Sequence, residues 1–169
     1  MLKLTKKADY GLIALRHLAQ TGRRPETGLW TSASAKDIAD AYGIPLPLLS
    51  KVLQRLAKCG MLASEQGTNG GYRLAKDASE ISTLEVIRAI DGPIILTQCF
   101  TEHSGCSRTE LCPVREPLRK VHEGILGLLS SITLADLAND DMPVPVFRPS
   151  LTKITMPGVE TTGMEIASS

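Results

Sequence analysis

The sequence predicts a mainly α-helical fold that contains one small β-hairpin and, near its C-terminal end, one long helix. Three observations predict it. Helix-capping residues repeatedly stand in front of segments whose apolar residues are three or four positions apart. A glycine-rich turn lies between two short apolar segments, as in a β-hairpin. Over residues 118–132, apolar residues recur at alternating intervals of three and four positions, which indicates a helix with one apolar face.

The composition limits the size and the chemistry of this fold. With 169 residues, the chain can form one domain with a hydrophobic core, or one small domain with an appendage. Aromatic residues make up only 4%, so the core must be aliphatic. The net charge is +1, but residues 1–76 carry 12 Lys and Arg against 5 Asp and Glu, whereas residues 77–169 carry 7 against 13. A basic first half indicates a nucleic-acid-binding region.

The first two helices are predicted from their ends. Thr5 can cap a helix that ends near Gly22, and residues 22–33 then form a loop. Ser34 caps a second, short helix, and Gly43 closes it at the position that favours a left-handed backbone. The residues of this second helix that are predicted to face inward are Ile38, Ala39 and Tyr42.

A third helix follows after a very short turn. Pro47 suits its first turn, the helix runs to about Cys59, and Gly60 stops it. One side is apolar, with Leu49, Val52, Leu53 and Leu56. Two helices joined in this way describe a helix-turn-helix, whose second member lies in the major groove of DNA. The residues expected to face bases or phosphates are Ser50, Lys51, Gln54 and Arg55.

A hairpin is predicted directly after the third helix. The apolar segments 61–63 and 72–74 flank a glycine-rich turn at 67–71, in which Asn-Gly supplies the positive backbone angles of a tight turn. A helix-turn-helix followed by such a hairpin is a winged helix, and Thr68 and Asn69 at the tip of the wing should reach the DNA. No Gly-Lys-Ser/Thr follows the glycines, so they do not form a nucleotide-binding P-loop.

The long helix near the C-terminal end is predicted to pair two subunits. A capping box at Ser82–Glu85 first opens a helix that ends at Gly92. The apolar seam that comes later has coiled-coil spacing and is narrow, which favours a homodimer over a place in the core. A short helix, 134–139, follows Thr133, and the stretch from 140 is rich in Pro, Thr, Ser and Gly and should be disordered. The seam residues are Leu118, Val121, Ile125, Leu128 and Ile132.

Three of the four cysteines, Cys99, Cys106 and Cys112, lie together in a C-x6-C-x5-C pattern. Their odd number, with no signal peptide and no apolar run that could cross a membrane, predicts reduced thiols in a cytoplasmic protein. Zinc sites prefer close cysteine pairs, whereas wide spacings suit an iron-sulfur cluster. A cluster is therefore favoured, with zinc and ligand-free thiols as alternatives. Cys59, at a helix end away from this segment, is predicted to be a small buried residue.

Several stretches together resemble one known family. They are Leu4–Tyr10 with Ala14–Leu15, the wing residues Asn69–Leu74, the three-cysteine segment and Ile132–Leu134. They are similar to the IscR/NsrR group of winged-helix transcription regulators, the Rrf2 family, over roughly residues 2–139. Within that group Asp91–Pro93, Thr97–Cys99 and Cys112–Arg115 look closest to regulators of the SUF iron-sulfur assembly operon.

The resemblance implies a homodimeric repressor of iron-sulfur assembly genes that senses through a bound cluster and is not an enzyme. A symmetric dimer would bind a pseudo-palindromic DNA operator. The resemblance also implies a cluster, 2Fe-2S rather than 4Fe-4S, on the three grouped cysteines. IscR-type members have a histidine ligand where this chain has Arg115. Nitric-oxide-sensing relatives use an aspartate donated across the dimer, and Asp9 stands at that position, with His103 as a rival.

The sequence implies a division into four parts: 1–92 for DNA binding, 93–113 for the cluster, 114–139 for dimerisation and 140–169 as a tail. Some relatives place an arginine in the wing where this chain has Gln66, so the operator sequence does not carry over. Two alternative functions stay open, a nitric-oxide-sensing iron-sulfur repressor and a cluster-free, thiol-responsive winged-helix repressor. A thiol redox enzyme is disfavoured because the chain has no C-x-x-C pair.

Overall fold

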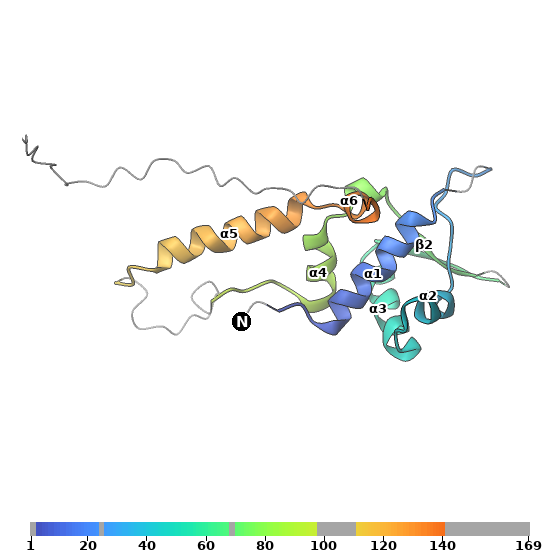
Figure 1. The fold of residues 1–169 in the computed structure, drawn as a ribbon, viewed down its shortest axis with the longest axis horizontal. Helices are drawn as coiled ribbons and strands as arrows, with labels where there is room; N and C mark the ends of the chain where they lie inside the picture. Colours follow the sequence, from blue (N-terminus) through green and yellow to red (C-terminus); the bar gives the residue numbers. More distant parts are fainter. Residues whose placement is uncertain (1–2, 24–25, 68–69, 98–110, 141–169) are drawn as a thin grey trace, which may run out of the picture.

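A computed structural model describes residues 3–23, 26–67, 70–97 and 111–140. Cys99, Cys106, Thr68, Asn69, His103 and the tail from 141 lie outside these residues. The predicted fold class is confirmed, because the chain is mainly helical with one two-stranded antiparallel hairpin (Figure 1). Its elements are α1 (Lys6–Gln20), α2 (Ala35–Tyr42), α3 (Leu46–Lys58), β1 (Leu62–Glu65), β2 (Gly71–Leu74), η1 (Ala78–Glu80), α4 (Thr83–Asp91), α5 (Arg115–Ser131) and α6 (Leu134–Ala138).

The predicted caps place the first helices. The Thr5 side chain accepts a hydrogen bond from the backbone N–H of Ala8, and Ser34 and Asp37 form a reciprocal capping box in front of α2. Gly43 ends α2 with a φ of 62°, in the left-handed region that a side chain would disfavour. This turn brings α3 across α2, and Ile44 in the turn is buried in the core.

The core lies between α1, α3 and α4 and is almost entirely aliphatic, as the composition requires. α3 contributes its whole apolar side, and α1 contributes small as well as large residues, so that neighbouring helices approach closely. The fully buried large side chains are Leu15, Leu18, Ile38, Leu49, Leu53, Leu56, Leu74, Ile81, Val86, Ile87 and Leu134.

The wing pairs β1 with β2, and Glu65 lies opposite Gly71 in the register. The wing is also tied to the segment in front of α2, because Ala33 and Tyr72 exchange two backbone hydrogen bonds of 3.0 and 2.9 Å. A Cβ on Gly71 would lie 2.3 Å from the carbonyl oxygen of Ala33. Glycine at this position therefore permits the close contact between the wing and the helix-turn-helix.

After α5 the chain returns to α4 and α1. The backbone N–H of Thr83 donates to the carbonyl of Ile132 at 2.8 Å, and the N–H of Leu134 donates to Ile81 at 2.9 Å. On the other side of α6, Arg16 of α1 donates to the carbonyl of Leu137 at 2.8 Å. The side chain of Leu134 has no exposed surface. The core around α1 thus includes a residue that lies beyond α5 in the sequence.

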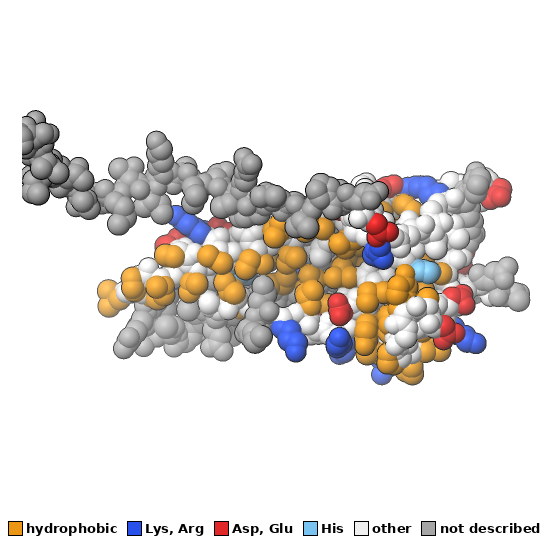
Figure 2. Space-filling view, viewed as in Figure 1, with side chains coloured by type: hydrophobic (Ala, Val, Ile, Leu, Met, Phe, Trp, Pro, Cys, Tyr) orange, Lys and Arg blue, Asp and Glu red, His pale blue; other side chains and the backbone are white. Residues whose placement is uncertain are grey.

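α5 extends away from the other helices, and none of its residues is buried (Figure 1). Figure 2 shows apolar side chains along the length of this helix. Pro117 is its third residue, where the missing N–H costs no helical hydrogen bond. The seam is only partly covered within one chain, since Val121 remains 51% exposed.

Two predictions about burial were wrong. Tyr42 is 40% exposed and meets His17 edge to face, with a hydroxyl-to-Nδ1 distance of 3.2 Å, because it is the last residue of α2 and its ring lies against the surface of α1 rather than in the core. Cys59 is exposed, because it follows α3 at the point where the chain turns outward. In addition, α5 ends at Ser131, so Ile132 is an extended residue after the helix.

Candidate functional site

The exposed face of α3 carries three polar or basic side chains at helical spacing, Lys51, Gln54 and Lys58. Residues three and four positions apart lie on one helix face, so these three side chains point in one direction. The opposite face of α3 is buried, and Leu53 and Leu56 have no exposed surface. The burial of one side fixes the rotation of α3 and leaves the basic side available to a partner.

The other two predicted DNA-facing residues lie beside this face. Ser50 is half-buried, at one edge. Arg55 is exposed, but its Nε donates a hydrogen bond to the carbonyl of Ala89 in α4, on the other edge. Of the four predicted residues, Lys51 and Gln54 therefore lie on the exposed face, while Arg55 reaches a neighbouring helix.

An ion pair joins the two strands of the wing. Arg73 Nε lies 2.9 Å from Glu65 Oε1, and both side chains are largely covered. Gly70 closes the turn by donating its N–H to the carbonyl of Gly67 at 2.9 Å. The described part of the wing leads toward Thr68 and Asn69.

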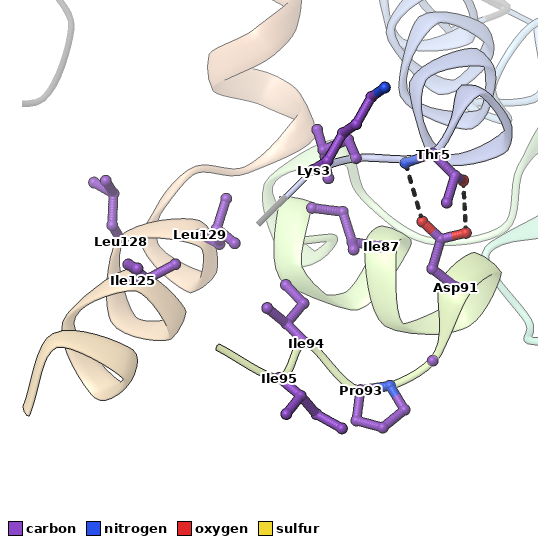
Figure 3. Close-up of a pocket in the computed structure, with 12 residues that line it drawn as sticks. Lys3, Thr5, Ile87, Asp91, Pro93, Ile94, Ile95, Ile125, Leu128 and Leu129 are labelled. Atoms are coloured by element: carbon purple, nitrogen blue, oxygen red, sulfur yellow. Dashed lines mark hydrogen bonds between the residues drawn. The ribbon is translucent and has the colours of Figure 1, made fainter. Parts of the chain in front are cut away.

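An apolar groove of about 540 Å³ lies between α4, the segment that follows it, and α5 (Figure 3). Two seam residues of α5, Ile125 and Leu128, form one wall, and Ile87 of α4 and Ile94 form the other. Ile95, further along the same segment, is 46% exposed. The seam therefore continues into a groove that one chain leaves open.

The predicted metal ligands are only partly described. Cys112 is a free, half-buried cysteine three residues before α5, and the carboxylate of Asp9 is exposed on the first turn of α1, 3.8 Å from Lys6 Nζ. α5 is 17 residues long, roughly 25 Å, and it begins at the end remote from α1 (Figure 1). Within the described residues no three candidate ligands gather. A thiolate at Cys112 and an oxygen ligand at Asp9 match the donor types that iron takes in proteins.

Among the described residues, the resolved pKa shifts belong to carboxylates that cap helices and to the ion pair of Glu116 with Arg119 on α5. Hydrogen bonds from the backbone and then the hydroxyl of Ser79, with Arg23, hold the pKa of Asp77 below its ordinary value. Hydrogen bonds from the backbone and the hydroxyl of Thr133 do the same to the pKa of Asp136. These carboxylates stabilise the loops that connect η1 and α6 to the core.

Several residues that shape the site were not predicted. Gly11 lies in the middle of α1, where a Cβ would come within 2.3 Å of Ile90. Asp91 accepts a 2.7 Å hydrogen bond from the hydroxyl of Thr5. A glycine inside a helix pattern is a sequence signal of close packing, whereas no local pattern announces the contact of Arg55 with α4.

A helix-turn-helix with a basic exposed face, followed by a short hairpin, defines a winged-helix DNA-binding protein. The sequence model of the Rrf2 family, described as iron-dependent transcriptional regulators, matches residues 4–140. The chain therefore belongs to the Rrf2 family, whose members are transcription regulators that bind DNA, typically as dimers, and are not enzymes.

Solved structures agree with this assignment. CymR (YrzC), the global cysteine regulator of B. subtilis, is 28% identical with a TM-score of 0.66, and the match covers 82% of this chain and 97% of that one. IscR from T. potens is also 28% identical, with a TM-score of 0.61 and coverage of 88% and 94%. The oxidized form of S. aureus CymR is 26% identical, with a TM-score of 0.63 and coverage of 82% and 97%.

A membrane-spanning helix was sought among the described residues, and none of their helices has the length and apolarity to be one.

Proposed function

We propose that this regulator is a homodimeric repressor of iron-sulfur assembly genes that senses through a bound iron-sulfur cluster. In this proposal residues 1–92 bind DNA, 93–113 hold the cluster, 114–139 join the subunits and 140–169 are a disordered tail. The protein acts in the cytoplasm, where thiols stay reduced. The observation that carries the DNA-binding part is the exposed face of α3 with Lys51, Gln54 and Lys58.

The α3 helix of each subunit is proposed to enter the major groove of a pseudo-palindromic operator. Two such helices about 34 Å apart would contact successive major-groove faces. Ser50, Lys51, Gln54 and Arg55 are the proposed contacts on α3, and Thr68 and Asn69 are those at the wing tip. A lysine that neutralises a phosphate also releases counterions, so its loss changes the salt dependence of binding.

Lys51→Ala tests this docking, with Lys120→Ala on α5 as the matched control. Binding to a duplex selected by the wild-type protein would be measured at several salt concentrations. We expect Lys51→Ala to weaken binding and to reduce the slope of log K against log salt by about 1. Equal affinity of Lys51→Ala and wild type across the salt series would contradict the docking.

Dimerisation is proposed through the seam of α5. Val121, Ile125 and Leu128 leave apolar surface uncovered in one chain, and the groove beside Ile87 extends it. A contiguous apolar surface of this kind is typical of a protein interface. A second copy of the chain, whose seam is also apolar, would cover both the seam and the groove.

The cluster, 2Fe-2S rather than 4Fe-4S, is proposed to be held by the thiolates of Cys99, Cys106 and Cys112. Asp9 of the partner subunit is the proposed fourth ligand, in keeping with the separation of α1 from the start of α5 in one chain (Figure 1). Bound there, the cluster would supply a redox-sensitive and iron-dependent link between these four residues. Binding and loss of that link can change DNA affinity when one state of the dimer binds DNA better.

A second function is supported by a specific observation. CymR, described as a global cysteine regulator, has the higher TM-score of the two named relatives, and one CymR structure is of an oxidized form. A cluster-free regulator whose cysteines respond directly to thiols is therefore the alternative, and a nitric-oxide-sensing cluster is a further one.

One experiment separates the cluster-binding functions from the cluster-free one. The protein would be purified without oxygen, its visible absorption recorded, and iron and sulfide counted per dimer, with Cys106→Ala and Asp9→Ala alongside. A brown protein that loses its absorption bands in Cys106→Ala supports the cluster, and Asp9→Ala then tests the fourth ligand. A colourless protein after reconstitution would contradict the cluster and favour the thiol-responsive repressor.

A further inference from the structure

The last turn of α4 contacts both helices that position the DNA-binding face. Its three final residues, Ala89, Ile90 and Asp91, each make a different contact with α1 or α3. α4 then ends at Gly92, and the chain continues toward the cysteine segment. This turn is therefore the point at which the cysteine segment joins the DNA-binding helices.

The first contact is polar and joins α4 to α3. Arg55 Nε donates to the carbonyl of Ala89. That carbonyl is one of the last four of α4, which have no acceptor role within their own helix, so the guanidinium supplies a missing partner. A cation at the C-terminal end of a helix is also favoured by the helix dipole.

The position of Arg55 on α3 explains this direction. Successive residues of an α-helix are rotated by roughly 100°, so Arg55 is rotated by roughly 40° from Lys51, toward the buried Val52, and lies at the edge of the exposed face. Its side chain leaves α3 at the edge that packs on α4. The arginine lies beside the DNA-binding face but is bonded to the helix behind it.

The second contact is apolar and leaves little room. A Cβ on Gly11 would lie 2.3 Å from Ile90 Cδ1 and 3.3 Å from Val52 Cγ1, so α1, α3 and α4 meet at this glycine. Val52 directly follows Lys51 in α3. Tightly packed side chains transmit a displacement because they cannot be compressed.

The third contact joins α4 to the start of α1. The carboxylate of Asp91 accepts from the hydroxyl of Thr5 at 2.7 Å and from its backbone N–H at 3.4 Å (Figure 3). Thr5 caps α1. A displacement of the chain after Gly92 would therefore be passed to the start of α1 and, through Arg55, to α3.

We infer that Arg55 is a positioning residue, which holds α3 against the last turn of α4 and couples the state of the cysteine segment to DNA affinity, rather than a direct DNA contact. The coupling rests on the proposed function, whereas the positioning role does not. Arg55 is then no longer one of the proposed DNA contacts on α3, whereas Lys51 and Gln54 remain so.

The positioning role is tested with Arg55→Met, which keeps the length of the side chain and removes its donors, and with Arg55→Lys, which restores a donor. Lys51→Met is the control for a DNA contact. Each would be titrated at several salt concentrations with a duplex selected by the wild-type protein from a random pool, and with single base-pair variants of it.

We expect Arg55→Met to weaken binding roughly 2- to 10-fold, the factor of one hydrogen bond, with the salt slope and the base preferences of the wild type, and Arg55→Lys to recover part of the loss. Lys51→Met should lower the salt slope by about 1. The positioning role would be overturned if Arg55→Met lowered the salt slope or lost the preference for one base pair. Unchanged DNA affinity of Arg55→Met would overturn it as well.

The coupling is tested by the ratio of DNA affinities of protein reconstituted with iron and sulfide and protein stripped with a chelator. We expect Arg55→Met to bring this ratio closer to one than in the wild type, which a general loss of stability would not do because it weakens both forms alike. An unchanged ratio would overturn the coupling. A wild-type ratio of one would instead count against the proposed cluster sensing, and the salt slopes would still decide the role of Arg55.

Discussion

Gly71→Ala tests the contact between the wing and the helix-turn-helix. The added Cβ would lie 2.3 Å from the carbonyl oxygen of Ala33 and 2.6 Å from its carbon. Carbon atoms in contact are about 3.5–4.0 Å apart, so the backbone at Ala33 must retreat by roughly 1 Å. This neighbour is backbone, and it cannot avoid the clash by changing a rotamer.

Either response of the structure costs stability. If Ala33 retreats, it loses its two hydrogen bonds with Tyr72, each worth about 0.5–1.5 kcal/mol. If it stays, overpacking costs about 1–3 kcal/mol. Alanine restricts the unfolded chain and returns about 0.4–1 kcal/mol. We therefore expect the free energy of unfolding to fall by about 1–1.5 kcal/mol.

Urea unfolding at matched protein concentration would measure this change, followed by circular dichroism and by the fluorescence of Trp30, the single tryptophan of the chain. Trp30 lies three residues before Ala33, and Arg23 stacks over its ring at 4.8 Å, so its emission should report the displaced segment. The control is Gly127→Ala on α5, where a Cβ meets no atom within 4 Å and the helix should gain up to about 1 kcal/mol. A loss below about 0.5 kcal/mol in Gly71→Ala would refute the reasoning.

Three further predictions follow from the core, the caps and the seam. Leu134→Ala should lower the free energy of unfolding by about 2–5 kcal/mol in urea titrations, because this fully buried leucine would leave a cavity; a loss typical of a surface site would show that α6 does not complete the core. Hydrogen bonds from Thr133 lower the pKa of Asp136 below its usual 3.8, so its stabilisation is present above that value and is lost as the pH falls through the lower, folded-state pKa. Asp136→Asn should therefore lose less stability than the wild type when unfolding is measured from pH 5 down to acid, and identical profiles would contradict the assignment. Val121→Glu should leave the secondary structure unchanged, since this side chain is 51% exposed in one chain, but should shift sedimentation from dimer to monomer if the seam joins two copies; a variant that remains dimeric would locate the interface elsewhere.

The sequence was most informative where a local pattern determines local structure. Thr5, Ser34 and Ser82 all cap helices as predicted, because an N-cap satisfies donors within its own turn. The buried side of α3 also follows from its periodicity. Such features depend on residues only three or four positions apart.

The features that were missed depend on distant parts of the chain. Tyr42 and Cys59 could each have been buried by their residue type, but each lies at a helix end and remains exposed, Tyr42 against the surface of α1 and Cys59 after the last turn of α3. The bond between Arg55 and Ala89 joins residues 34 positions apart and depends on how α3 crosses α4. The amphipathic pattern of α3 gives the same polar assignment to Arg55 as to Lys51, so it could not separate a contact with DNA from a contact with α4.

The return of the chain to α1 after α5 has a consequence for protein synthesis. Leu134 fills the core only after α5 has been made, so a nascent chain cannot complete the core around α1 before α5 exists. An early stop codon within α5 would give a product that lacks Leu134 and is therefore expected to be less stable than the full chain, rather than a fully folded fragment that competes for the operator. Because Leu134 is needed to complete the core, a truncated chain that folds and interferes with the full-length regulator should be difficult to produce by mutation.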